Sequence, residues 1–157
     1  MPRGSGAKSE QIATLISEFR TGGNLDRAFD NRAADALGVS VTDLHCLNIV
    51  ENSGGVTAGE LAAEAGLTTG AVTGVLDRLE AVGYARRRAD PADRRRVRVE
   101  VTDRFYARAG EIWGPVAAEW QEALGRRFTA AELDLISGFL RESNDLTRRN
   151  LERIREA

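Results

Sequence analysis

The sequence is poor in the residues from which most metal and catalytic sites are built. It contains one cysteine, Cys46, and one histidine, His45. A single cysteine excludes an internal disulfide, and one cysteine with one histidine cannot supply the usual ligands of zinc. The two residues are also neighbours, so on a helix their side chains point about 100° apart, which does not suit a nucleophile–base pair.

Long apolar segments are missing as well. No run of about 18 apolar residues occurs, and residues 1–11 lack the hydrophobic stretch of a signal peptide. A phosphate-binding glycine loop is not recognisable either. We therefore expect a cytoplasmic protein that is not an enzyme, needs no metal or cofactor, and has no membrane partner.

The charge of the chain is unevenly distributed. The 157 residues are 42% hydrophobic and 29% charged, which fits one soluble domain, or a small domain with an oligomerisation region. Seven arginines fall within residues 86–98, and residues 84–102 carry a net charge of +4. Because the whole chain has a net charge of -2, the remainder carries -6. A basic element on an acidic protein predicts a localised contact with a polyanion.

The spacing of apolar residues predicts a mostly helical chain. Two capping boxes, Thr57 with Glu60 and Thr129 with Glu132, mark helix starts. The pair Gly22 and Gly23 leaves open whether the first helix is continuous, kinked or broken. The expected helices are residues 12–37, 40–52, 57–65, 68–83, 103–124 and 129–154.

The period changes from 3.6 to 2 after the fourth expected helix. Residues 84–88 have the composition of a strand, and residues 97–101 alternate valine with charged side chains. Between them, Asp90-Pro91-Ala92-Asp93 is typical of a turn. The sequence therefore predicts an antiparallel hairpin whose loop and outer face carry the arginines.

A helix-turn-helix pattern precedes this hairpin. Ala62 is a small residue where two helices would cross, Gly66 allows a left-handed turn, and Val72 and Val75 would seat the second helix. The same four positions also fit an ordinary helical corner. The basic hairpin that follows favours a winged helix that binds double-stranded DNA.

The fourth helix would then enter the major groove. Thr68, Thr69, Gly70 and Thr73 lie in its N-terminal half, where hydroxyls and backbone amides can meet phosphates and base edges. Each of these residues also fits a cap or a neutral surface position. Further along, Arg78 suits either a phosphate contact or an ion pair with a nearby carboxylate.

The wing supplies the other candidate contacts. We expect Arg88, Arg94, Arg95 and Arg96 to follow the DNA backbone, with one guanidinium able to enter the minor groove. We interpret Asp93 as a clamp whose carboxylate holds Arg95 in a fixed direction. A solvated run of charge is the alternative for the arginines.

Residues 67–84 and 90–102, which include the Asp-x-Arg sequence Asp93-Arg94-Arg95, resemble the MarR (multiple antibiotic resistance regulator) family of bacterial transcriptional regulators. The resemblance is strongest over residues 42–102. It implies a mainly α fold with a small β wing, in which a winged helix-turn-helix is joined to a helical dimerisation region. It further implies a homodimer, usually a repressor, with a ligand pocket between the dimer interface and the winged helix.

We accordingly divide the chain into a DNA-binding region, residues 38–102, and a dimerisation region, residues 8–37 and 103–157. A dimer has independent support, because the terminal helices cannot easily bury all their apolar faces against one small domain. Two recognition helices predict a pseudo-palindromic operator with half-sites about 34 to 36 Å apart. The alternative function is a winged-helix module for protein interaction, without a specific operator.

Aromatic residues are the candidates for the implied pocket. Phe19, His45 and Trp113 suit a small aromatic or anionic effector, and Phe29 and Trp120 are further candidates. Each residue also fits the core or a dimer interface. We interpret Cys46 as a small buried residue rather than an oxidation sensor.

Overall fold

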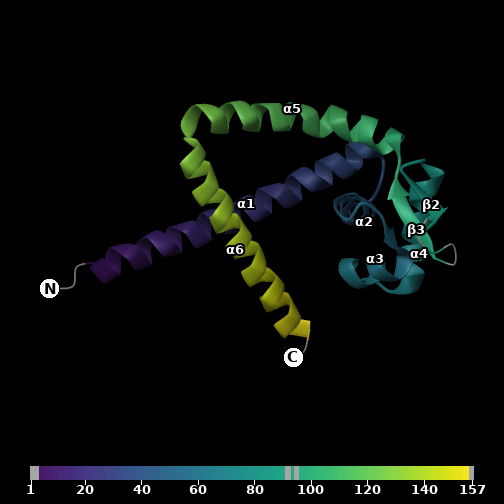
Figure 1. Cartoon of the computed structure of the whole chain (residues 1–157), viewed down its shortest axis with the longest axis horizontal. Helices are drawn as coiled ribbons and strands as arrows, with labels where there is room; N and C mark the ends of the chain where they lie inside the picture. Colours follow the sequence, from purple (N-terminus) through teal and green to yellow (C-terminus); the bar gives the residue numbers. More distant parts are fainter. Residues whose placement is uncertain (1–3, 91–92, 94–95, 156–157) are drawn as a thin grey trace. The chain divides into compact units, whose positions relative to one another are not determined.

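The computed structural model describes residues 4–90, 93 and 96–155. The chain is mainly α-helical with one small sheet, as the sequence predicts (Figure 1). Its elements, in chain order, are α1 (Gly4–Leu37), α2 (Val41–Asn52), β1 (Val56–Thr57), α3 (Ala58–Ala65), α4 (Thr69–Ala81), β2 (Ala85–Ala89), β3 (Val97–Val101), α5 (Asp103–Arg127) and α6 (Ala130–Arg155). Two compact units, Met1–Ile112 and Trp113–Ala157, divide within α5 and are described separately.

Helix α1 is continuous through Gly22 and Gly23, so the uninterrupted alternative is the one observed. Each glycine costs roughly 1 kcal/mol relative to alanine, which a 34-residue helix can absorb. The last turn packs on the first unit through Ala33, Ala34 and Leu37, all of which are buried. Gly38, with φ of 71°, then ends the helix.

Helices α2, α3 and α4 pack on one another and form the core of the first unit, beside strands β2 and β3 (Figure 1). Leu44, Leu47, Leu61 and Leu79 are among its fully buried side chains. Gly66 takes φ 66° and ψ 30° between α3 and α4, which confirms the expected left-handed turn. The helix-turn-helix geometry is therefore built as the spacing predicts.

The start of each helix is fixed by local hydrogen bonds. The predicted capping boxes of Thr57 with Glu60 and of Thr129 with Glu132 are both present. Helix α2 has a third box, in which the Ser40 hydroxyl accepts from the Asp43 N–H and the Asp43 carboxylate accepts from the Ser40 N–H. Such boxes satisfy amides that have no partner inside the helix.

The sheet is antiparallel, with strand order β1-β3-β2. Strands β2 and β3 are the predicted hairpin. Strand β1 was not predicted, because two residues are too few to show a period. Val99 of β3 is buried between its partners Val56 and Arg87, and so joins the wing to the segment before α3.

The end of α1 and the starts of β2 and α5 meet around two rings. The Tyr84 hydroxyl donates to the Leu37 carbonyl at 3.1 Å, and its ring lies edge-on to buried Phe105 at 5.9 Å. The Thr102 hydroxyl donates to the Gly83 carbonyl at 2.6 Å and caps α5 by accepting from the Phe105 N–H. The wing is thus tied at its base to both long helices of the first unit.

Large apolar side chains remain exposed on two of the long helices. They are Ile12, Leu15, Ile16, Phe19 and Leu25 on α1, and Leu135, Phe139, Leu140, Leu146, Leu151 and Ile154 on α6. Despite their length, none of the described helices is apolar enough to cross a membrane.

Candidate nucleic-acid interface

Helix α4 turns one face inward and leaves a face of small residues outside. Its buried side chains are Val72, Val75, Leu76 and Leu79. On the opposite side, Gly70 and Thr73 are exposed. A Cβ built at Gly70 would meet nothing within 4 Å, so packing within the chain does not require this glycine. The exposed start of α4 can therefore approach another surface closely.

The hydroxyls of Thr68 and Thr73 already form hydrogen bonds within the helix and its cap. Thr68 is the N-cap residue, and its hydroxyl accepts from the Ala71 N–H at 3.2 Å. The Thr73 hydroxyl donates to the Thr69 carbonyl at 3.0 Å. These two hydrogen bonds hold the side chains of Thr68 and Thr73 close to the helix backbone. A contact of either hydroxyl with a ligand would form in addition to them.

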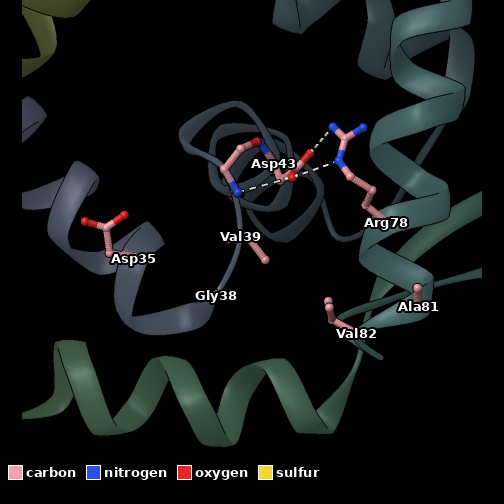
Figure 2. A pocket seen from close by; sticks show the side chains of 8 residues that line it. Asp35, Gly38, Val39, Asp43, Arg78, Ala81 and Val82 are labelled. Atoms are coloured by element: carbon pink, nitrogen blue, oxygen red, sulfur yellow. Dashed lines mark hydrogen bonds and ion pairs between the residues drawn. The ribbon is translucent and has the colours of Figure 1, made fainter.

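Arg78 forms the carboxylate pair that the sequence left as one of two alternatives. Its Nε and Nη2 atoms donate to the two carboxylate oxygens of Asp43 at 3.1 and 2.6 Å (Figure 2). The Asp43 side chain is 3% exposed and that of Arg78 is 57% exposed. Burial alone would raise the pKa of Asp43, but the hydrogen bonds from Arg78 and Ser40 outweigh it and lower the pKa. The pair fixes the start of α2 against α4.

The exposed wing arginines form loose ion pairs. Arg86 and Arg88 both approach Glu100, at 3.0 and 3.9 Å, and Arg96 lies 3.0 Å from Glu60 at the start of α3. The side chains of Arg88 and Arg96 are 66% and 53% exposed. Exposed pairs of this kind contribute only about 0 to 1 kcal/mol, so a phosphate can compete for these guanidinium groups.

Two other arginines bind the body of the first unit. Arg87 reaches two carboxylates of α4, with Nη2 2.9 Å from Asp77 Oδ1 and Nη1 paired with Glu80. Arg98 donates to the Gly55 carbonyl and lies 3.7 Å from Asp90, which is buried. The described arginines of the basic segment are therefore of two kinds: the side chains of Arg86, Arg88 and Arg96 are more than half exposed, and those of Arg87 and Arg98 are about one third exposed.

The wing turn is closed by its backbone. The Asp90 N–H donates to the Arg96 carbonyl at 2.9 Å, and the Arg96 N–H donates to the Asp93 carbonyl at 2.8 Å. Asp93 also donates its N–H to Asp90 Oδ1 at 3.4 Å. Arg94 and Arg95 lie outside the described residues, so the expected clamp between Asp93 and Arg95 stays a prediction.

Comparison with known proteins gives this arrangement a family. The MarR family profile matches residues 37–96, which contain α2, α3, α4 and the start of the wing. Over 150 residues the chain is 37% identical to YcgE of Bacillus subtilis (strain 168), an HTH-type transcriptional regulator, covering 96% of this chain and 97% of YcgE. The chain belongs to the MarR family.

Solved structures agree with this assignment. A crystal structure of MarR is 28% identical, with a TM-score of 0.53 over 88% of this chain and 98% of the other. FabT of Streptococcus pneumoniae, crystallised in complex with DNA, has a TM-score of 0.60 at 19% identity over 87% and 98%. The winged helix of this MarR-family transcriptional regulator is thus a DNA-binding fold.

A pocket of about 550 Å³ adjoins the Asp43–Arg78 pair of this MarR-family protein (Figure 2). Its lining residues are Asp35, Gly38, Val39, Ser40, Asp43, Arg78, Ala81 and Val82. The effector candidates do not line it. Phe19 and His45 are exposed on α1 and α2, and Trp113 is half-buried at the start of the second unit. Their role in effector binding stays a prediction.

Cys46, the single cysteine, lies in the core of the first unit. Cys46 is 0% exposed. Burial and the nearby Asp43 carboxylate raise the pKa of its thiol. A protonated and buried thiol reacts slowly with oxidants, which fits the interpretation as a packing residue.

Within the part of the chain that the structure describes, no group of three or more His, Cys, Asp and Glu side chains could hold a metal ion.

Sequence reasoning named Arg78 and Arg96 but did not identify the carboxylates with which they pair. Asp43 and Arg78 are 35 residues apart, and Arg96 and Glu60 are 36 residues apart, so no local spacing announces either pair. Arg87 and Glu80 are only seven residues apart. Since Glu80 lies in the last turn of α4 and Arg87 in the middle of β2, neither the helical nor the strand period relates them.

Proposed function

We propose that this regulator binds double-stranded DNA as a homodimer at a pseudo-palindromic operator and represses transcription there. The main support for this proposal is that the exposed face of α4 consists of small residues and adjoins a wing with exposed arginines. In each protomer α4 enters a major groove, and the wing follows the neighbouring backbone. The DNA in the FabT crystal structure supports this use of the shared fold.

Helix α4 supplies the groove contacts. Thr68 and Thr69 place the first backbone amides of α4 toward a phosphate, where the partial positive charge of the helix start favours an anion. Gly70 and Thr73 allow the helix to sit deep in the groove, because neither carries a long side chain. Base readout by α4 therefore involves few side chains, and DNA shape contributes the rest of the specificity.

The wing supplies phosphate contacts through Arg88, Arg94, Arg95 and Arg96. The guanidinium groups of Arg88 and Arg96 are exposed and form surface ion pairs, which a bidentate phosphate can replace. Asp93 shapes the turn that presents them. Arg78 is a secondary candidate, because its guanidinium remains more than half exposed while it holds Asp43.

The homodimer is supported by the exposed apolar side chains of α1 and α6. Large apolar areas in water are unfavourable by about 25 cal/mol per Å², and a two-fold interface buries the same patch on both protomers. A dimer also supplies two copies of α4, as a pseudo-palindrome requires.

A small aromatic or anionic effector completes the proposal, with Phe19, His45 and Trp113 as candidate contacts. Such a ligand relieves repression by favouring a dimer geometry that fits the operator less well. Thermal-shift screening against phenolic and other aromatic acids tests this part. A melting temperature that responds to none of them counts against an effector of this class.

The DNA-binding proposal is tested by selection from a library of randomised duplexes, followed by anisotropy titration of the selected duplex. We expect enrichment of a pseudo-palindrome, and a large loss of affinity in Arg95→Ala and Arg88→Ala. The matched control is Arg126→Ala, an exposed arginine of α5 outside residues 38–102, which should bind like the wild type. Selection that enriches no duplex contradicts the proposal.

A protein-interaction module is the second candidate. The observation that favours it is that Arg86, Arg88 and Arg96 are all paired with carboxylates of their own chain. If these pairs persist against DNA, Glu100 and Glu60 offset two of the three positive charges, and fewer guanidinium groups are free to bind phosphate. This function predicts that the wild type and Arg88→Ala both fail to bind any selected duplex.

A further inference from the structure

Arg87 and Arg88 are adjacent on β2 but have different surroundings. Side chains alternate between the two faces of a strand, so Arg86 and Arg88 share one face and Arg87 lies on the other. Arg86 and Arg88 both approach Glu100 of β3. Arg87 instead faces α4, where its guanidinium meets Asp77 and Glu80. Half as much of its side chain is exposed, 33% against 66% for Arg88.

The contact between Arg87 and α4 involves the backbone as well as the side chain. The Arg87 N–H donates to Glu80 Oε1 at 2.8 Å, while the other oxygen of the same carboxylate pairs with Nη1. Nη2 donates to Asp77 Oδ1 at 2.9 Å. The hydrogen bond to Asp77, followed by the charges of Glu80 and Asp77, raises the pKa of Arg87 despite partial burial. One guanidinium thus spans two carboxylates on successive turns of the proposed recognition helix.

Arg87 also occupies a central place in the sheet. Its partner across the sheet is Val99, which is buried and pairs on its other side with Val56. The wing therefore contacts α4 through Arg87, and it contacts the segment before α3 through the pairing of Val99 with Val56. Arg87 thus joins the two elements that the proposed function places on DNA.

We propose that Arg87 is a positioning residue, which sets the angle between α4 and the wing and offsets part of the negative charge of Asp77 and Glu80, rather than a phosphate contact. This inference rests on the proposed DNA binding. Without Arg87, the carboxylates of Asp77 and Glu80 lose their cationic partner, and the wing is no longer linked to α4 at this point. DNA binding then weakens although no phosphate contact has been removed.

The planar fork of arginine is essential to this role. Its separate N–H groups reach two carboxylates at once, whereas lysine offers a compact charge that cannot span them. At a phosphate contact, by contrast, lysine still neutralises the phosphate as a point charge, although it cannot bind it in the bidentate way. Arg87→Lys therefore separates the two roles, because it keeps the charge and removes the fork.

The test uses the full-length protein, the selected duplex and anisotropy titrations over about 50 to 200 mM salt. We expect Arg87→Gln and Arg87→Lys to lower affinity about tenfold or more, with Arg87→Lys keeping the wild-type salt slope. Arg88→Gln should instead flatten the slope by about 0.9 for each phosphate that the variant no longer neutralises. Wild-type affinity in Arg87→Lys, or a slope flattened in Arg87→Gln as in Arg88→Gln, overturns the inference.

Glu80→Gln is a second test, which does not depend on the folding of the Arg87 variants. The two roles of the Arg87–Glu80 contact predict opposite changes in DNA affinity for this variant. If Glu80 merely masks Arg87, its removal tightens DNA binding. If the contact positions the wing, removal weakens binding, and the loss disappears in the Arg87→Gln background. The matched control is Glu64→Gln, an exposed carboxylate of α3, which reports the general effect of one less negative charge.

The proposed function and this inference fail differently. A wild-type protein that binds no selected duplex contradicts both together. A wild type that binds DNA, with Glu80→Gln tighter than Glu64→Gln, overturns the inference alone.

Discussion

The carboxylate of Asp43 takes part in two structural contacts at once. It accepts from the Ser40 N–H at 3.2 Å and from two nitrogens of Arg78. One residue therefore caps α2 and holds α4. If this contact breaks, water can still solvate the exposed guanidinium of Arg78. The carboxylate of Asp43 is buried and would be left without these hydrogen-bond partners, so the loss of stability arises mainly at Asp43.

We predict that Asp43→Asn lowers the free energy of unfolding by about 1 to 3 kcal/mol, since a charged hydrogen-bond partner is removed at a buried position. Urea unfolding followed by circular dichroism measures the change. Asp35→Asn is the control, because Asp35 lines the same pocket but is exposed. Equal midpoints for the two variants would show that the contact is not stabilising.

The same contact predicts a dependence of stability on pH. The pKa of Asp43 is lower in the fold than its usual value, because hydrogen bonds from Arg78 and Ser40 outweigh the opposing effect of burial. A carboxyl with a lowered pKa stabilises the fold above its unfolded pKa, about 3.9, and loses this effect as the pH falls through the folded pKa. The stability difference between wild type and Asp43→Asn should therefore shrink below about pH 4. A constant difference from pH 6 to pH 3 contradicts this assignment.

At the scale of elements, the helices were predictable because their ends are determined locally. Ser40, Thr57, Thr68 and Thr129 each cap a helix with a residue three positions further on. The wing strands were predictable from their period. Strand β1 and the inner contacts of Arg87 and Arg98 were not, since they depend on segments that meet only after folding. The position of the site could thus be predicted from the sequence. Which arginines are exposed and which contact the rest of the first unit could not be predicted.

Two glycines of the helix-turn-helix should respond oppositely to alanine. Gly66 has φ of 66°, so Gly66→Ala should lower the free energy of unfolding by about 1 to 2 kcal/mol. Gly70 is helical and open, so Gly70→Ala should raise it by up to about 1 kcal/mol. Thermal unfolding measures both changes.

The Gly70 variant also separates folding from binding. If α4 approaches DNA closely, Gly70→Ala gains stability but loses affinity for the selected duplex. A variant that is more stable and binds as well as the wild type would place Gly70 outside the groove.

At the scale of the whole molecule, the exposed apolar residues of α6 predict self-association. Sedimentation should give twice the chain mass of 17.1 kDa. Leu151→Asp introduces a charge among these residues and should shift the protein toward monomer while the helical circular dichroism persists. Glu152→Asp, one residue along, is the control. A wild type that sediments as a monomer contradicts the homodimer.

DNA binding by the wing depends most on whether phosphates displace the carboxylates that pair with its arginines. The direct measurement is the slope of log affinity against log salt for the wild type on the selected duplex. Four wing arginines in each of two protomers, Arg88, Arg94, Arg95 and Arg96, predict a slope of about -7. An affinity that does not change with salt would show that the arginines stay paired with their own chain and that the wing does not grip DNA.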